Sequence, residues 1–318
     1  MKQKKVKIGV IGVGHLGTYH VQKYKNIENV ELVGVVDTNQ SRAREIAEKF
    51  GTSCFETHND MLEKVDGVSL AVPTEEHYSV AKDILCRGVH LLVEKPITYD
   101  LSHADSLIHL AKTNRLVLQV GLVERFNPAV VKMQELLTKP ILVESHRMNE
   151  FTVRGIDVDV VLDLMIHDLD IILHIIKSEL RYVHAVGMSV LTEKTDVANA
   201  RLIFDDGTVA NLTASRVSNK TLRKIRVFQP DAYLSVNCAK RKIGIIRLDG
   251  QLKDSNGYPQ VCTNEILFPD SDPLADEIGS FVNAVACGGQ PVVTGDDGRR
   301  ALDVALQIIG QIERNSKN

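Results

Sequence analysis

Apolar residues in the first third of the chain gather in short continuous runs, separated by segments with helical spacing. The runs are rich in β-branched residues and cover Val6–Ile11, Val30–Val36, Gly67–Val72, Val89–Val93 and Leu116–Gly121. The helical patterns cover Gly17–Lys25, Ser41–Phe50, His77–Arg87 and Leu101–Thr113. Continuous apolar runs are typical of strands covered on both faces, and strand–helix alternation is typical of a parallel sheet. The pattern predicts a doubly wound α/β domain whose ligand lies at the carboxyl ends of the strands.

In the second half the runs lengthen and alternate between apolar and polar residues. They cover Leu142–Met148, Arg181–Leu191, Ala198–Phe204, Thr208–Val217, Arg223–Phe228, Ala232–Asn237 and Ile243–Leu248. Helical patterns cover Asp157–Lys177, Asp276–Cys287 and Asp296–Glu313, and Asp205-Asp206-Gly207 is typical of a hairpin turn. We predict an α+β domain with a large, mainly antiparallel sheet, and a division of the chain into residues 1–122 and 123–318. Helices on a single face leave the other face open, so we expect a homodimer or homotetramer to form through the sheet.

A glycine-rich turn follows the first predicted strand and opens a helix. The segment reads Gly12-Val13-Gly14-His15-Leu16-Gly17, a GxGxxG pattern. Gly12 allows a tight turn, Gly14 lets the backbone approach a pyrophosphate, and Gly17 lets the helix pack closely on the strand. Because the motif lies between a strand and a helix near the start of the chain, it predicts a dinucleotide-binding Rossmann domain.

An acidic residue ends the second predicted strand, about twenty residues after the glycines, where the dinucleotide pattern expects one. The Asp37 carboxylate can accept the hydroxyl groups of an adenosine ribose and would repel a 2′-phosphate, which favours NAD over NADP. Arg42 follows and can stack on the adenine or, as the alternative, tolerate a phosphate. A helix cap or turn residue is the other interpretation of Asp37.

Composition narrows the class of protein without naming a function. The 318 residues include 38 Lys and Arg against 41 Asp and Glu, a formal net charge of −3 that disfavours nucleic acid or a charged membrane surface as partner. The five cysteines form no CxxC pair, and no apolar stretch approaches a membrane span. We expect a reduced, cytoplasmic protein.

Two sets of polar side chains are candidates for chemistry. Lys95 follows a predicted strand in Glu94-Lys95-Pro96 and would point at the nicotinamide end of a bound dinucleotide. Asp163 and His167 lie one helical turn apart and share a face, which Asp170 and His174 extend. A purely structural Asp–His pair is one alternative. A metal site is another, but four ligands spread over three turns cannot converge on one small ion, and we expect none.

These motifs together resemble the glucose–fructose oxidoreductase/inositol dehydrogenase (Gfo/Idh/MocA) family. The resemblance rests on the glycine motif, Glu94-Lys95-Pro96, the Asp163–His167 pair and the stretch from Pro73 to His77. It implies that His167 transfers a proton, that Asp163 is its neighbour and that Lys95 completes the catalytic group. The residues that the resemblance adds to the cofactor site are Pro73, Thr74, His77 and Glu94, beside Gly12, Gly14, His15, Leu16, Gly17, Asp37, Arg42 and Lys95.

Within that family the chain is most similar to a bacterial nucleotide-sugar branch. Arg125 and Asn127 follow the last predicted strand of the first half and are candidates to face the substrate; for Arg125 an ion pair with Glu124 or Glu144 is the alternative. Arg154 is a candidate partner for a substrate diphosphate, with a solvated loop residue as the alternative. The expected function is NAD-dependent oxidation of a secondary hydroxyl of a sugar, a nucleotide amino sugar in particular. The alternatives are an inositol or free-sugar dehydrogenase or reductase, and a non-catalytic dinucleotide or sugar sensor.

Overall fold

The computed structural model describes residues 5–152, 158–253, 257 and 259–315, and its chain divides into two compact units. The first unit comprises Met1–Val123 and Leu274–Leu302, and the second comprises Glu124–Pro273 and Asp303–Asn318. The first break falls one residue from the predicted boundary. The sequence-based division placed Leu274–Leu302 in the second half, whereas in the structure this segment belongs to the first unit.

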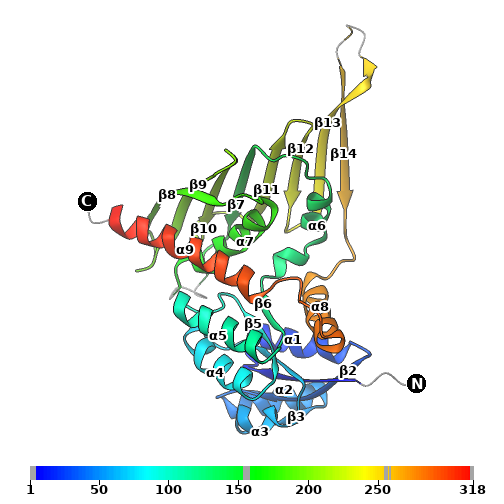
Figure 1. Ribbon diagram of the computed structural model, residues 1–318, viewed down its shortest axis with the longest axis vertical. Coiled ribbons are helices and arrows are strands. Elements are labelled where there is room, and N and C mark those ends of the chain that lie inside the picture. The colour runs from blue at the N-terminus through cyan, green and yellow to red at the C-terminus, as the bar shows by residue number, and fades with distance from the viewer. Residues whose placement is uncertain (1–4, 153–157, 254–256, 258, 316–318) are drawn as a thin grey trace. The chain divides into compact units, whose positions relative to one another are not determined.

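The first unit contains a six-stranded parallel sheet (Figure 1). Its strands are β1 (Val6–Ile11), β2 (Val30–Val36), β3 (Ser53–Cys54), β4 (Gly67–Leu70), β5 (His90–Glu94) and β6 (Leu118–Gly121). Their spatial order, β3-β2-β1-β4-β5-β6, is that of a doubly wound dinucleotide-binding sheet. The predicted Rossmann fold is therefore confirmed.

The first unit also contains helices, and most of them were predicted. They are α1 (His15–Lys25), α2 (Gln40–Phe50), α3 (His58–Leu62), α4 (Thr74–Cys86), α5 (Leu101–Thr113) and α8 (Pro273–Cys287). Phe281 and Ile278 of α8 are fully buried in the same hydrophobic cluster as Ile8 and Val10 of β1. This burial explains why a segment so late in the chain belongs to the first unit.

The second unit contains an eight-stranded sheet in the order β14-β13-β12-β11-β7-β10-β9-β8. Its strands are β7 (Leu142–Met148), β8 (Leu180–Met188), β9 (Val197–Phe204), β10 (Val209–Ser215), β11 (Leu222–Gln229), β12 (Ala232–Asn237), β13 (Lys242–Lys253) and β14 (Pro259–Leu267). All neighbours are antiparallel except β7 and β10, which are parallel. The predicted hairpin joins β9 to β10, with Gly207 at φ 86°. The mainly antiparallel sheet is thus confirmed.

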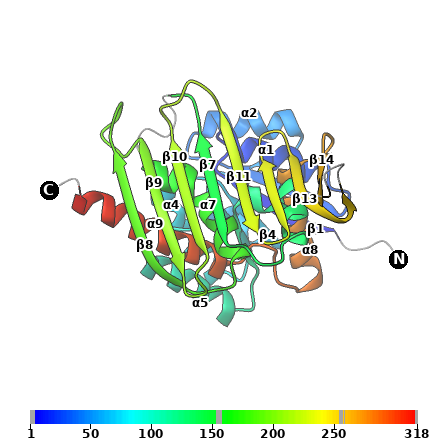
Figure 2. The same ribbon diagram turned by 90° about the horizontal axis from the view of Figure 1, so that it is seen from above.

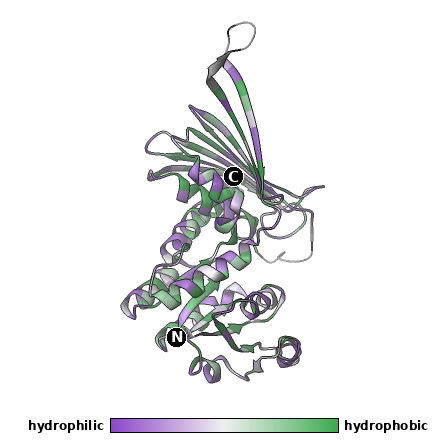
Figure 3. Cartoon of the chain, turned by 90° about the vertical axis from the view of Figure 1, so that its right-hand side faces the viewer, coloured by the Kyte–Doolittle hydropathy of each residue, from purple (hydrophilic) through white to green (hydrophobic). Residues whose placement is uncertain are grey.

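Helices of this unit lie on one face of the sheet (Figure 2). They are a 3₁₀ turn (Val123–Phe126), α6 (Pro128–Glu135), a π-helical turn (Val161–Met165), α7 (Ile166–Ile175) and the part of α9 (Gly295–Asn315) beyond Leu302. Hydrophilic and hydrophobic residues alternate along the strands (Figure 3), as in β9, where Ala198, Ala200 and Leu202 are buried and the two polar residues between them are exposed. One face of the sheet therefore supports the helices, and the other is open.

Among the helices in the described part of the chain, none combines the length and the apolarity that a membrane crossing needs.

Candidate functional site

The three glycines after β1 occupy three different environments. Gly12 has φ 81°, and a Cβ there would lie 2.5 Å from the Ala71 carbonyl oxygen. A Cβ on Gly17 would lie 1.8 Å from the Gly12 carbonyl oxygen, whereas a Cβ on Gly14 would meet nothing within 4 Å. Gly12 and Gly17 are thus required by the packing of the loop itself. Gly14, at the N-terminus of α1, borders open space that fits the approach of a pyrophosphate to the helix N–H groups.

Asp37 and Arg42 hold this glycine loop in place. The Asp37 carboxylate accepts hydrogen bonds from the Val13 and Asn39 backbone N–H groups, both at 2.8 Å. Arg42 donates from Nε to the Val13 carbonyl oxygen at 3.2 Å and from Nη2 to Thr18 Oγ1 at 3.1 Å. Arg42 and His15 also line a cavity of about 320 Å³ between α1 and α2. The turn interpretation of Asp37 fits these bonds, and its predicted contact with a ribose remains a prediction, as does adenine stacking by Arg42.

The loops after β4 and β5 are joined through a buried histidine. Pro73 and Thr74 begin α4, and His77 on the first turns of that helix is 1% exposed. Its Nδ1 lies 2.9 Å from the Pro96 carbonyl oxygen and its Nε2 lies 3.0 Å from the Val72 carbonyl oxygen. Burial lowers the pKa of His77, although both carbonyls oppose this shift. His77 therefore braces the two loops, and a direct contact of this side chain with the cofactor remains a prediction.

Glu94 ends β5 with its side chain buried, and Lys95 follows it in a loop where the Lys95–Pro96 peptide is cis. Glu94 accepts a hydrogen bond from His20 Nε2 at 2.9 Å, and His20 Nδ1 lies 3.1 Å from Ser69 Oγ. Within the described ranges, His20, Glu94 and Glu277 are the side chains whose ligand atoms come close enough for a metal ion, all within 4.8 Å. Because both ring nitrogens of His20 already face protein partners, we assign no metal to this group.

The predicted catalytic helix begins as a π-helical turn, a geometry often found at functional sites. The Asp159 side chain accepts from the Val161 N–H at 2.8 Å, and the Val160 N–H donates to the Thr195 carbonyl at 3.0 Å. Asp163 lies in the π turn and His167 in the first turn of α7, and both are half-buried. The single α-helix predicted over Asp157–Lys177 is thus shorter, and Asp157 lies outside the described residues.

Residues flanking His167 are fixed by buried ion pairs. Arg147 of β7 donates to Asp168 Oδ1 from Nη2 at 2.7 Å and to Glu124 Oε1 from Nη1 at 2.8 Å. All three side chains are at least 90% buried. Burial alone would raise the pKa of Glu124, but the Arg147 guanidinium lowers it below its usual range. The first turn of α7 is thereby anchored to the sheet beside His167.

The residues predicted to face the substrate have protein partners in the second unit. Arg125 is 3% exposed and forms a two-pronged pair with Asp170, at 2.9 Å from Nε and 2.5 Å from Nη2. Asn127 caps α6 by accepting from the Ala129 N–H, and its amide donates to the Cys238 carbonyl oxygen at 3.0 Å. The acidic partner described for Arg125 is thus Asp170, which the expected alternatives Glu124 and Glu144 did not include. Substrate contacts by these two residues remain predictions, and Arg154 lies outside the described residues.

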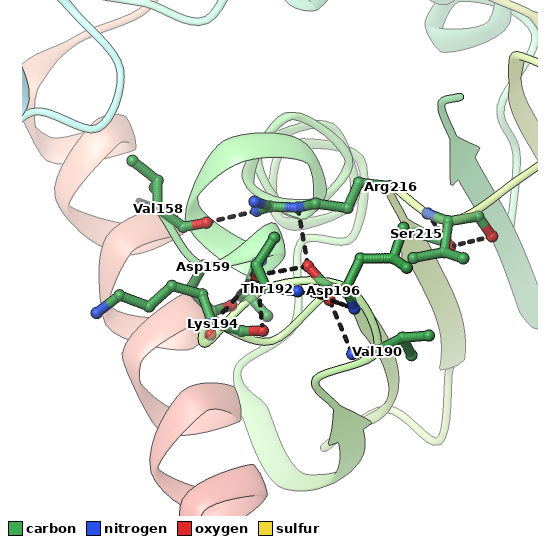
Figure 4. Close-up of polar contacts among 11 residues, drawn as sticks. Val158, Asp159, Val190, Thr192, Lys194, Asp196, Ser215 and Arg216 are labelled. Atoms are coloured by element: carbon green, nitrogen blue, oxygen red, sulfur yellow. Dashed lines mark hydrogen bonds and ion pairs between the residues drawn. The ribbon is translucent and has the colours of Figure 1, made fainter. Parts of the chain in front are cut away.

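A second anchor holds the start of the π turn (Figure 4). Asp196 is fully buried and accepts from the backbone N–H groups of residues 190, 191 and 192, at 2.6 to 2.8 Å. Its Oδ1 lies 3.7 Å from Arg216 Nε, and Arg216 Nη2 donates to the Val158 carbonyl oxygen. Burial opposes ionisation, but these donors lower the pKa of Asp196 to about 2. One carboxylate thus holds both the β8–β9 loop and the entry to the predicted catalytic helix.

Lys95 lies in the first unit, and Asp163 and His167 lie in the second. The structure brings Asp163 and His167 onto consecutive helical turns, and their combination with Lys95 remains a prediction. Sequence reasoning missed the anchoring groups Arg147, Asp168 and His20. The available signal for Arg147 was its inward position in the β7 alternation, because a buried arginine needs an acidic partner.

Comparison with known proteins agrees with this architecture. Residues 6–122 match the model of the oxidoreductase family with an NAD-binding Rossmann fold, and residues 140–235 match the GFO/IDH/MocA C-terminal domain. These matches cover both units, and the chain belongs to the Gfo/Idh/MocA oxidoreductase family.

Particular relatives narrow the class further. The chain is 39% identical over 309 residues to UDP-N-acetylglucosamine 3-dehydrogenase of Acidithiobacillus ferrooxidans, covering 97% of each chain. A solved structure of that enzyme matches with a TM-score of 0.90 over 98% of each chain. A myo-inositol 2-dehydrogenase of Thermotoga maritima is 25% identical, covering 93% of each. A scyllo-inositol dehydrogenase from Lactobacillus casei with bound NAD(H), 20% identical with a TM-score of 0.80 over 98% of each chain, shares the fold.

Proposed function

We propose that this oxidoreductase uses NAD to oxidise a secondary hydroxyl of a nucleotide amino sugar, with carbon 3 of UDP-N-acetylglucosamine as the leading candidate. The observation that carries the proposal is the 39% identity over 97% of both chains to an enzyme with that activity. The inositol dehydrogenases are less similar over the same length, so inositols are the second class of substrate to test.

The residues around the glycine loop fit NAD. Open space at Gly14, the α1 N-terminus behind it and the Asp37 carboxylate after β2 together suit a pyrophosphate and an unphosphorylated ribose. NAD, when bound, supplies the nicotinamide ring that accepts a hydride. Asp37 already accepts two backbone hydrogen bonds, but each carboxylate oxygen has a second lone pair for a ribose hydroxyl.

Three side chains of this chain would handle the substrate hydroxyl. His167, a half-buried residue, takes its proton as general base. The Lys95 ammonium holds the same oxygen and stabilises the negative charge that develops on it. Asp163, on the preceding turn, orients His167 or holds a neighbouring hydroxyl of the sugar.

The open face of the second unit's sheet supports a homo-oligomer. Exposed apolar side chains gather at its two ends, with Tyr182 and Met188 on β8 and Leu248 and Val261 on the β13–β14 pair. Leu248 and Val261 are direct cross-strand partners and are about 60% exposed. We propose that a second copy of the chain covers this face.

The function is tested with purified protein, NAD and a panel of UDP-N-acetylglucosamine, inositols and free hexoses, by following reduced nicotinamide. We expect kcat/KM to be highest for the nucleotide sugar. Alanine at Lys95 or His167 should lower kcat by about 10²- to 10⁴-fold while the Kd for NAD is kept. Tight NAD binding with no turnover of any polyol would favour the sensor instead.

A further inference from the structure

A chain of four buried polar side chains links α1 to the end of β5. Tyr24 Oη lies 2.7 Å from Ser69 Oγ, Ser69 Oγ lies 3.1 Å from His20 Nδ1, and His20 Nε2 lies 2.9 Å from Glu94 Oε1. Tyr24 and His20 come from α1, Ser69 from β4 and Glu94 from β5. None of them is more than 9% exposed, so water does not compete for these bonds.

The directions of these hydrogen bonds follow from the donors available. Burial raises the pKa of Tyr24 well above its usual range, so its hydroxyl keeps a proton and can donate to Ser69. Because a carboxylate only accepts, we assign the ring proton of a neutral His20 to Nε2, which donates to Glu94, and Ser69 then donates to His20 Nδ1. This arrangement uses every donor once and ends on an acceptor-only group.

Glu94 is also confined from its other side. It is the parallel partner of Gly121 on β6, where a Cβ would lie 3.0 Å from the Glu94 carboxyl carbon. The absence of a side chain at residue 121 therefore leaves the room that this carboxyl occupies. The Glu94 carboxylate thus lies between β6 on one side and His20 on the other, with the Glu277 carboxylate also nearby.

We propose that His20 is a positioning residue for Lys95: by donating from Nε2 to Glu94, it fixes the strand end from which the Lys95 ammonium reaches the substrate. The inference rests on the proposed function, because it concerns the placement of a catalytic lysine. His20 also lies one turn beyond Gly17 on α1, so the same contact ties the helix of the glycine loop to the Glu94-Lys95-Pro96 segment. Misplacement of a catalytic group by about 1 Å can cost about 10²-fold in rate.

Two amide substitutions at His20 separate positioning from bulk stability. The nitrogen of Gln reaches the place of imidazole Nε2, and the nitrogen of Asn reaches the place of Nδ1. We expect His20→Gln to keep kcat within about threefold of wild type, and His20→Asn to lose about 10- to 100-fold. The KM for NAD should change little in either. Equal losses in the two variants would overturn the proposal.

Val21→Ala is the matched control, because Val21 is the next residue of α1 and is also fully buried. It should lower the melting temperature without a selective loss of kcat. If kcat across all three variants simply follows the melting temperature, His20 is only structural and the proposal fails.

A readout without turnover keeps this inference separate from the proposed function. In ¹⁵N spectra of histidine-labelled protein, the His20 ring should carry its proton on Nε2, and a proton on Nδ1 would overturn the inference. Wild-type protein that turns over no sugar at all would contradict the proposed function instead, whatever the tautomer.

Discussion

Gly14 and Gly17 lie three residues apart in one motif, but the space around them differs. The Cβ that alanine would add at residue 17 meets a backbone oxygen at 1.8 Å, whereas at residue 14 it meets nothing within 4 Å. Gly17 is therefore required by the packing of α1 against the glycine loop, whereas Gly14 leaves the open space that the proposed pyrophosphate contact needs. One glycine of the motif, Gly17, is thus needed for the fold, and we propose that the other, Gly14, is needed for cofactor binding.

This difference predicts opposite results for two alanine variants. Gly17→Ala should lower the free energy of unfolding by about 1–3 kcal/mol, because the loop must shift to admit the methyl group. Gly14→Ala should keep nearly wild-type stability and weaken NAD binding by at least about tenfold. Thermal melts and titrations of reduced nicotinamide fluorescence measure both, without tryptophan background because the chain has no Trp. Equal effects of the two substitutions on stability would contradict this account.

Residues whose role depends on sequence neighbours were predictable, and residues whose role depends on distant partners were not. The glycine motif spans six residues, and their spacing alone predicts the turn. Arg125 binds Asp170, 45 residues further along the chain, and no local pattern pairs those two positions. His77 has a family motif, but its partner Pro96 lies 19 residues further along the chain and comes near because β4 and β5 are adjacent.

At the scale of elements, α7 is attached to its sheet by charge as well as by apolar packing. Removing Arg147 would leave Asp168 buried without its guanidinium and would remove the nearer of two guanidinium groups at Glu124. Breaking a buried pair in this way costs about 3–5 kcal/mol. Arg147→Met should lower the free energy of unfolding by about that amount in urea titrations.

Arg226→Met is the matched control for Arg147→Met. Arg226 pairs with Glu144 on the neighbouring strands β11 and β7, at 3.0 Å, but both side chains are about a third exposed. Such a pair contributes about 0–1 kcal/mol. Similar losses in the two methionine variants would show that burial of the Arg147 network is not what anchors α7.

The Asp196 anchor predicts a pH dependence. Its pKa in the folded protein is about 2, below the usual aspartate value of 3.8, so the charged form stabilises the fold. That stability is fully present above about pH 4 and is lost as the pH falls toward 2. Asp196→Asn should therefore lower the melting temperature clearly at pH 7 and much less near pH 2.5. A deficit independent of pH would contradict a role for the carboxylate charge.

Long periodic elements were predictable from the sequence, and short or polar ones were not. The bounds of β1, β2, α5, β7 and β12 match the predictions. Strand β3 has two residues, too few for a period, and β14 carries mostly exposed residues in Pro259–Leu267, so it lacks an apolar run. The π turn at Val161–Met165 depends on Asp159 and Thr195, and helical spacing alone does not distinguish it from an α-helix.

At the scale of the whole chain, the change in hydrophobic pattern predicted two domains, and the glycine motif located the first. The return of Leu274–Leu302 to the first unit was not visible in the pattern, because an amphipathic helix shows which face is buried and not against which sheet. The burial of Phe281 in the cluster around β1 shows that this segment packs on the first sheet.

The open sheet predicts an assembly larger than one 35.2 kDa chain. Light scattering after size-exclusion chromatography should give a multiple of this mass. Leu248→Lys should shift the protein toward the monomer, because an ammonium on the covered face would be buried without a partner. Val292→Lys, at an exposed apolar residue of the first unit, should leave the mass unchanged. A monomeric wild type would contradict the proposed interface.

The most direct test of the central claim follows the hydrogen that leaves the substrate. UDP-N-acetylglucosamine carrying deuterium at carbon 3 is incubated with the protein and NAD, and the mass of the reduced nicotinamide cofactor is measured. The account predicts reduced cofactor that is one mass unit heavier than with unlabelled sugar. Reduced cofactor without deuterium, or no reduction by this sugar while an inositol reacts, would contradict it.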